Sequence, residues 1–106
     1  MSFQLGSALL DACVLAVLTR EDAYGYILTQ QVKEVMNISE STLYPVLRRL
    51  QKDGYLITYD QSFQGRNRRY YQITDSGKAK YKEYILEWEE YKLRVDKILL
   101  GGIVSE

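Results

Sequence analysis

The segment from Ser39 to Gly54 places apolar residues on one side of a helix and polar and basic residues on the other. Its apolar residues follow the i, i+3, i+4, i+7 spacing of an amphipathic helix: Leu43, Val46, Leu47 and Leu50. A hydroxyl at Ser39 can accept a hydrogen bond from an unpaired N–H of the first turn. Gly54 stands where a left-handed residue ends a helix. The sequence therefore predicts a helix over residues 39–52 with two distinct faces.

The polar face of this helix carries side chains suited to a polyanion. Hydroxyls near its N-terminal end suit base edges and phosphates, and the cations farther along suit phosphates. Pro45 is unusual, because a proline inside a helix costs about 3 kcal/mol, although the cost is smaller in the first turns. Backbone amides at residues 39–41 add a place for a phosphate. We predict a recognition helix that contacts DNA through Ser39, Ser41, Thr42, Tyr44, Pro45, Arg48, Arg49 and Lys52.

Arg49 has a second interpretation. It can instead form an ion pair with an acidic residue on a neighbouring helix, within its own domain.

The first helix of the chain, residues 3–19, is apolar nearly all the way round and is interrupted by Asp11. Such a helix must be covered on every side. One small domain covers about one face of it, so the remaining surface is expected to meet a second subunit.

A second helix is expected over residues 23–36, with Asp22 as its cap. It keeps an apolar stripe at helical spacing: Tyr24, Ile27, Leu28, Val32 and Val35. Gly25 in its first turn indicates close approach of another part of the chain. Two helices joined by a short connector, the second with polar and basic groups outward, form a helix-turn-helix.

A β-hairpin is expected directly after the recognition helix. Residues 55–59 and 68–73 are rich in β-branched and aromatic residues and predict two strands, joined by a polar turn region over residues 60–67. Three arginines lie by its tip and on the return strand: Arg66, Arg68 and Arg69. They can reach phosphates or a minor groove and release condensed counterions. A solvated hairpin edge protected by charge is the alternative, but three arginines beside a recognition helix favour a DNA-binding wing.

The net charge of the chain is zero, yet the charge is unevenly distributed. Residues 1–32 carry a net −2, residues 33–82 a net +5 and residues 83–106 a net −3. A basic middle between acidic ends suits a protein with one face on DNA and the other turned away. A solvated surface of mixed charge explains the same distribution.

The last helix carries a long apolar seam. Thr74 is expected to cap it, and Asp75 suits the positive end of the helix dipole. Apolar residues then recur in alternating steps of three and four, and this 3.5-residue period indicates contact between helices. Little of the domain is left to cover the seam, so we predict a homodimer. Its interface comprises Leu9, Leu10 and Cys13 of the first helix with Tyr81, Tyr84, Trp88, Tyr91, Val95 and Ile98 of the last.

Composition argues against several other classes of protein. A chain of 106 residues forms one modest core. There is no histidine, no nucleophile–base pairing, no metal-ligand spacing and no glycine loop for phosphates, so we expect no enzyme, metal site or cofactor. The single cysteine, Cys13, is interpreted as a small buried hydrophobe in a reducing cytoplasm. Neither a membrane span nor a signal peptide is expected, so the predicted location is cytoplasmic.

Four segments of the chain form a combined pattern together with Gly77. The segments are YGY at 24–26, STLYPVLRRL at 41–50, DGYL at 53–56 and GRNRRYYQIT at 65–74. From about Leu9 to Leu100, this pattern resembles the PadR family of bacterial transcriptional regulators. The resemblance implies a mainly α, winged helix-turn-helix unit of three helices and a two-stranded wing over residues 1–76. A long C-terminal dimerisation helix over residues 77–106 completes it. It further implies a homodimer that represses transcription from a palindromic site.

The resemblance is to the branch of the family with a single C-terminal helix, and it suggests a ligand site there. Some members of that branch bind planar hydrophobic compounds between the two C-terminal helices, where a tryptophan stacks on the ligand. Trp88 lies eleven residues after Gly77, about where that tryptophan falls, and Tyr84 and Tyr91 lie one turn away. Two interpretations stay open: Trp88 lines a ligand pocket, or it packs in a closed dimer core.

Two other classes of function stand beside a DNA-binding repressor. The first is a small-molecule (multidrug) sensor or binding protein, with ligand binding at Trp88 as its main activity. The second is a protein-interaction module that uses the same scaffold without DNA, since fold does not fix function. The clustered cations of the recognition helix and the wing disfavour this second class.

Overall fold

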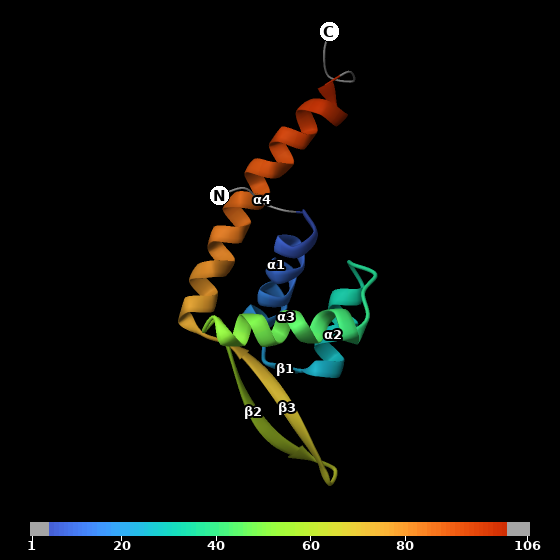
Figure 1. The fold of residues 1–106 in the computed structure, drawn as a ribbon, viewed down its shortest axis with the longest axis vertical. Coiled ribbons are helices and arrows are strands. Elements are labelled where there is room, and N and C mark those ends of the chain that lie inside the picture. The colour runs from blue at the N-terminus through green and yellow to red at the C-terminus, as the bar shows by residue number, and fades with distance from the viewer. Residues whose placement is uncertain (1–4, 102–106) are drawn as a thin grey trace.

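The computed structural model describes residues 5–101 of the chain, with side chains from residue 7 onward. A body of three helices carries the β2–β3 hairpin at one end, and α4 runs beside α1 and projects at the other end (Figure 1). The predicted winged helix-turn-helix with a long C-terminal helix is confirmed. In chain order the elements are α1 (Leu5–Arg20), β1 (Ala23–Tyr24), α2 (Gly25–Lys33), α3 (Glu40–Lys52), β2 (Leu56–Phe63), β3 (Arg66–Ile73) and α4 (Asp75–Leu99).

The core lies between α1, α2, α3 and the base of the hairpin. Its fully buried hydrophobic side chains are leucines and valines, and burying each one stabilises the fold by about 1.5–3 kcal/mol. They are Val14, Leu15, Leu28, Val32, Leu43, Leu47, Leu50 and Leu56. The opposite side of α1 is only half-buried within one protomer, through Ala8, Leu9, Ala12, Cys13, Ala16 and Val17.

Two expectations for the first helix need adjustment. Residues 3 and 4 of the predicted helix lie outside the described residues, and α1 extends to Arg20. Leu10 is 6% exposed and belongs to the core of its own subunit, so it offers little surface for the predicted dimer interface. The periodicity did not separate Leu10 from Leu9, because α1 is apolar on nearly all sides.

The α3 helix forms as the sequence predicts. The Ser39 hydroxyl accepts a hydrogen bond from the Thr42 N–H at 3.3 Å, which caps the first turn. Leu43, Leu47 and Leu50 are buried, so the apolar stripe faces the core. Pro45 lies in the second turn and cannot donate to the Ser41 carbonyl. That part of α3 faces solvent, which can satisfy the carbonyl instead.

A left-handed glycine ends α3, as predicted. Gly54 has φ +85°, and the Tyr55 N–H reaches back to the Leu50 carbonyl at 2.9 Å. This is the Schellman arrangement, which turns the chain away from the helix axis. The next residues can therefore leave α3 directly into β2.

The wing is longer than predicted. β2 and β3 pair without interruption from Leu56↔Ile73 to Phe63↔Arg66, so the expectation of a polar turn over residues 60–67 is wrong. Only Gln64 and Gly65 form the turn, both with positive φ (50° and 78°), as in a tight hairpin turn. The outer part of the ribbon has exposed side chains on both faces. No face of this outer part is buried, so the sequence there shows no hydrophobic alternation that would predict strands.

A short strand, β1, was not predicted. Ala23 and Tyr24 pair with Tyr71 and Tyr70 of β3, giving a sheet of order β1-β3-β2. The second helix consequently begins at Gly25, not at residue 23, and it ends at Lys33, before the predicted residue 36.

Two side-chain expectations for the second helix are wrong, because both assumed helix bounds that α2 does not have. Asp22 does not cap α2, whose N-cap residue is Tyr24 and has no side-chain capping bond. Its carboxylate instead accepts hydrogen bonds from the Tyr59 hydroxyl at 2.6 Å and from Gln72 at 3.2 Å. Val35 lies beyond the helix end and is 74% exposed.

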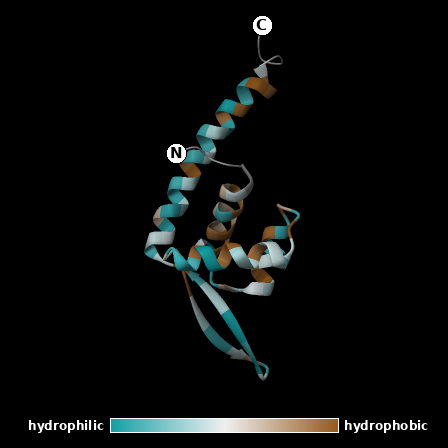
Figure 2. Ribbon diagram, viewed as in Figure 1, coloured by the Kyte–Doolittle hydropathy of each residue, from teal (hydrophilic) through white to brown (hydrophobic). Residues whose placement is uncertain are grey.

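The α4 helix starts at the base of the wing. The Thr74 hydroxyl accepts a hydrogen bond from the Gly77 N–H at 3.0 Å, which confirms the predicted cap. The first half of α4 lies against α1, with Tyr81, Trp88 and Tyr91 packed on the core. The second half projects beyond the body and still carries apolar residues near its end (Figure 2). Exposed apolar side chains there include Leu93, Ile98, Leu99 and Leu100.

Candidate nucleic-acid interface

The outer face of α3 presents most of the predicted DNA contacts to solvent. Five of these residues are exposed along the helix: Ser41, Thr42, Pro45, Arg48 and Lys52. At its N-terminal end, the Ser39 hydroxyl lies 2.8 Å from that of Ser41 and 3.3 Å from that of Thr42. These hydroxyls surround the positive end of the helix dipole, where anions are favoured. α3 therefore offers hydroxyls at one end and cations at the other.

The three wing arginines lie in different settings. Arg66 is exposed beside the turn. Arg69 forms an ion pair with Asp60 at 3.6 Å, but both side chains are at least half exposed, so the pair is weak and easily exchanged for a phosphate. Arg68 lies between two rings, 4.2 Å from the Tyr24 centroid and 4.1 Å from the Phe63 centroid. Both rings hold its guanidinium in one place.

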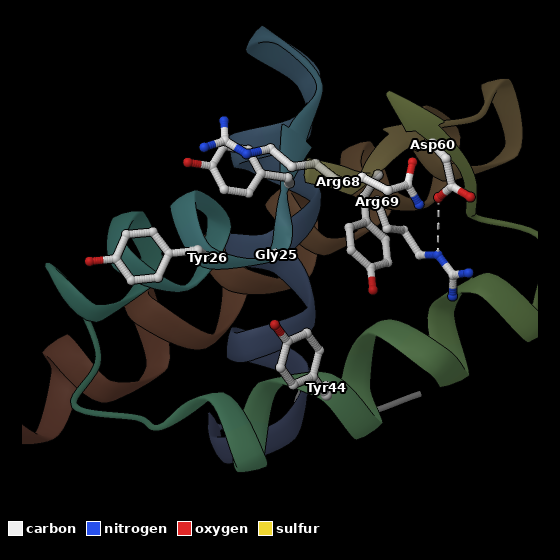
Figure 3. A pocket seen from close by; sticks show the side chains of 9 residues that line it. Gly25, Tyr26, Tyr44, Asp60, Arg68 and Arg69 are labelled. Atoms are coloured by element: carbon white, nitrogen blue, oxygen red, sulfur yellow. Dashed lines mark ion pairs between the residues drawn. The ribbon is translucent and has the colours of Figure 1, made fainter. Parts of the chain in front are cut away.

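A hollow of about 500 Å³ lies between α3, the start of α2 and the wing. In Figure 3, Tyr44 rises into it from α3, while Arg68, Arg69 and Asp60 approach from the wing. The hollow combines cations with phenol hydroxyls, and both can donate to phosphate oxygens. Its lining comprises Tyr24, Gly25, Tyr26, Tyr44, Asp60, Asn67, Arg68, Arg69 and Tyr71.

Two hydroxyls of this hollow, those of Tyr44 and Tyr71, remain proton donors. Burial and the nearby Glu40 charge raise the pKa of Tyr44. Burial is also the main reason that the pKa of Tyr71 is raised, against an opposing effect of Arg69 and Arg48. The charges of Arg48 of α3 and Arg69 of the wing thus both reach Tyr71.

Gly25 lets α2 pass close to the Tyr44 side chain. A Cβ at this position would lie 2.8 Å from the Tyr44 hydroxyl oxygen and 3.1 Å from its ring, closer than side chains normally approach. The predicted close approach at Gly25 is therefore confirmed. The YGY segment at 24–26 supplies a stacking ring, a gap for Tyr44 and an exposed tyrosine to the same hollow. The sequence did not assign these residues to the site, because only the unpredicted strand β1 places them there.

Arg49 points away from this surface. Its two terminal nitrogens bind the Asp11 carboxylate at 2.6 and 3.1 Å, so the alternative of an ion pair with a neighbouring helix holds. Both terminal nitrogens thus bind inside the domain, and the DNA contact of Arg49 stays a prediction. Asp11 is only 4% exposed, and Tyr84 donates a further hydrogen bond to it at 3.0 Å.

Tyr84 is also an interior residue. It is 8% exposed, and burial, followed by the charge of Asp11, raises its pKa well above the ordinary tyrosine range. The Tyr84 hydroxyl donates to Asp11 inside the domain. It is therefore not placed for the predicted contacts with a ligand or with a second subunit. The seam periodicity located the buried stripe of α4 but did not show that α1 of the same subunit covers this part.

Four of the other predicted interface residues, Leu9, Cys13, Tyr81 and Trp88, line a groove between α1 and α4. It has a volume of about 160 Å³ and is lined by Leu9, Ala12, Cys13, Ala16, Tyr81, Tyr84, Ile85 and Trp88. Burial raises the pKa of the half-buried Cys13 thiol, so the thiol stays protonated and behaves as a hydrophobe. Farther along the seam, Val95 is half-buried and Ile98 is 84% exposed.

No group of three or more metal-ligating side chains occurs within residues 5–101. In the same part of the chain, each helix is too short or too polar to span a lipid bilayer.

Known proteins share both the sequence and this arrangement. The model of the transcriptional regulator PadR-like family matches residues 14–83. The transcriptional regulator Rv3488 of Mycobacterium tuberculosis is 38% identical over 82 residues, which cover 76% of this chain and 73% of that protein. The crystal structure of smu.1704 from Streptococcus mutans UA159 is similar over 100% of both chains, with 42% identity and a TM-score of 0.86.

A PadR family transcription regulator from Clostridium difficile R20291 has a similar crystal structure. The similarity covers 85% of this chain and 97% of that one, with 28% identity and a TM-score of 0.78. These regulators are not enzymes, and PadR regulators bind DNA. The family model covers the recognition helix, the wing and the first third of α4. The chain therefore belongs to the PadR-like family of transcriptional regulators.

Proposed function

We propose that this protein is a bacterial repressor that binds a palindromic DNA site as a homodimer in the cytoplasm. The observation that carries the proposal is the hollow between α3 and the wing, where the Tyr44 hydroxyl of α3 meets Arg68 and Arg69 of the wing. In winged-helix complexes a recognition helix enters the major groove and the wing follows the adjacent minor groove. The sugar–phosphate backbone separates these two grooves, so it must cross the space between the two elements. Here that space is lined by Tyr44, Arg68 and Arg69.

Each element has a defined task in this proposal. Ser41, Thr42 and Tyr44 stand near the N-terminal end of α3, where base edges and phosphates are contacted. Arg48 and Lys52 bind phosphates, and the wing arginines fix the orientation of the protein on the duplex. The two α3 helices of a dimer enter successive major grooves, about 34 Å apart.

The direct test is selection from random duplex DNA by the purified protein. The proposal expects an enriched sequence with two inverted half-sites about 10 bp apart, centre to centre. Protection of the DNA upstream of its own gene is a second measurement, and reduced transcription from that promoter distinguishes a repressor from an activator. If no sequence is enriched and the protein binds all duplexes with the same affinity, the proposal is contradicted.

Replacing Arg68 with lysine should weaken binding to the selected DNA by about three- to tenfold, while the salt dependence stays unchanged. The charge is retained, but a lysine cannot stack between Tyr24 and Phe63 and is not held in place. Equilibrium binding across a range of salt concentrations separates the two effects. Equal affinity of the variant and the parent protein would show that the stacking does not prepare the wing for DNA.

The proposed dimer rests on the projecting half of α4. The stripe that covers α1 in the first half of the helix continues through Val95 and Ile98, and Ile98 is left 84% exposed by the described residues 5–101. The half-buried side of α1 borders the earlier part of the same stripe, through Leu9, Ala12 and Cys13. A second copy of the chain would cover both surfaces, because a two-fold axis pairs the same apolar patches with one another.

Changing Ile98 to glutamate should weaken the dimer by about 100-fold or more, because burying a carboxylate without a partner costs several kcal/mol. Ile98 is 84% exposed in the protomer, so the fold itself should be unaffected. Sedimentation velocity over a range of protein concentrations measures the change.

Leu86→Glu is the matched control for this variant. Leu86 is also an exposed apolar residue of α4, at 69%, but lies roughly 120° around the helix from Ile98. Dissociation by Leu86→Glu alone would place the interface on another side of α4.

A second candidate function is binding of a planar hydrophobic compound beside Trp88. The apolar groove between α1 and α4 favours it, and the Trp88 and Tyr91 rings lie 6.3 Å apart. One protomer alone provides about 160 Å³, below the roughly 300 Å³ of ordinary ligand pockets, so two subunits would have to build the site. Quenching of Trp88 fluorescence by micromolar planar aromatic compounds supports this function, and no quenching by a broad panel leaves a repressor without such an effector.

A further inference from the structure

Three helices meet at a single buried carboxylate. Asp11 of α1 is 4% exposed and accepts two hydrogen bonds from Arg49 of α3 and one from Tyr84 of α4. We refer to Asp11, Arg49 and Tyr84 as the Asp11 node. The residues lie 38 and 73 positions apart in sequence from Asp11. The node thus joins the helix that faces DNA to the helix that carries the proposed dimer surface.

The node differs from the contacts around it in being directional. The other core contacts of α1 are largely apolar, and hydrophobic burial is non-directional, so it tolerates small shifts of one helix along another. A bidentate arginine and a phenol donor on one carboxylate accept only a narrow range of positions. Buried polar groups in other proteins serve such a role by fixing the register of packed helices.

We propose that the Asp11 node is a positioning device, which sets the distance between the two DNA half-sites that a dimer reads. This inference rests on the proposed function. In a two-fold dimer built on α4, a shift of α3 relative to α4 changes the separation of the two α3 helices by up to twice that shift. One base pair adds about 3.4 Å along the duplex. A shift of about 1.7 Å in each subunit therefore matches the added length of one base pair, which also turns the half-site by about 34° around the duplex axis.

Tyr84 is the member of the node to test, because it is the link to α4. Tyr84→Phe keeps the buried ring and removes only the hydroxyl that donates to Asp11. Tyr81→Phe is the matched control, since Tyr81 lies one turn earlier on α4 in the same groove but outside the node. The double variant Asp11→Leu/Arg49→Met removes the remaining charged pair and provides a second test if Tyr84→Phe does not fold.

The experiment measures binding to the selected operator and to versions whose half-sites are moved by one or two base pairs in each direction. The parent protein and Tyr81→Phe should lose about tenfold or more in affinity for each base pair of error, about 1.4 kcal/mol. Tyr84→Phe should bind the operator nearly as well, but lose only about threefold for an error of one base pair. A purely structural role would lower affinity for all spacings equally.

Identical spacing profiles for Tyr84→Phe and the parent protein would overturn the inference and leave the proposed function intact. Failure of the parent protein to select any operator would instead contradict the proposed function, and the inference with it. A flattened profile in both tyrosine variants would also overturn it, because any lost hydroxyl on α4 would then have the same effect.

Discussion

Replacing Arg49 with methionine is expected to lower the free energy of unfolding by about 3 kcal/mol, because it leaves the Asp11 carboxylate buried with one remaining donor. Breaking a buried ion pair from one side costs about 3–5 kcal/mol. The lower end applies here, since the Arg49 side chain is 46% exposed and water reaches part of the pair. Urea unfolding followed by circular dichroism, at fixed protein concentration, measures the change.

Replacing Asp11 and replacing Arg49 should lower the free energy of unfolding by different amounts. Asp11→Leu is expected to cost about 1 kcal/mol, because the half-exposed Arg49 can turn its charge into solvent. The double variant Asp11→Leu/Arg49→Met should recover most of the loss caused by Arg49→Met, since an apolar pair of similar volume often replaces a buried ion pair without cost. A loss below 1 kcal/mol for Arg49→Met would show that the carboxylate is better hydrated than its 4% exposure indicates.

Replacing Arg66 and Arg69 with alanine should weaken DNA binding by about 100-fold or more, for every sequence alike, through the loss of phosphate contacts. A dimer would lose up to four such contacts. Because each contributes about 0.9 to the slope of log affinity against log salt, the slope should become shallower by up to about 3.6. Both side chains are exposed, and the Arg69 pair with Asp60 is weak, so the fold should be unaffected.

The matched control for charge is Lys92→Ala/Arg94→Ala. These two exposed cations lie on α4, in ion pairs with Glu89 and Glu90, and their removal changes the net charge by the same amount. The control should leave the salt dependence nearly unchanged. Equal slopes for the wing variant and the parent protein would mean that the wing does not contact phosphates.

The sequence predicts best where local chemistry decides the structure. The segment 39–54 carries its own cap, apolar stripe and left-handed stop, and α3 follows all three. The cap at Thr74 is local in the same sense. Where neighbours distant in sequence decide, the expectations fail. Ala23 and Tyr24 extend as a strand only because β3 offers them an unpaired edge, and this pairing displaces the expected cap and helix start.

The candidate site was partly accessible to prediction for the same reason. Arginines on a hairpin after an amphipathic helix indicate DNA contact without any structure. The hollow between the recognition helix and the wing could not be predicted from that pattern. Tyr24 and Tyr26 line it because β1 pairs with β3, and this pairing was not predicted. The ion pair of Arg49 was foreseen as an alternative, yet its partner is 38 residues away, and no periodicity relates the two positions.

The connection between the wing and α4 has a mechanical consequence. β3 ends at Ile73 and α4 begins at Asp75, so Thr74 is the pivot between them. With 25 residues, α4 is a lever about 37 Å long. Rotation by about 5° at the pivot would move the far end of such a lever by about 3 Å. The Thr74 hydroxyl fastens this pivot, since it donates to the Gly54 carbonyl at 2.7 Å and accepts from the Gly77 N–H at 3.0 Å. One small side chain thereby limits an angular error that the length of α4 would otherwise amplify.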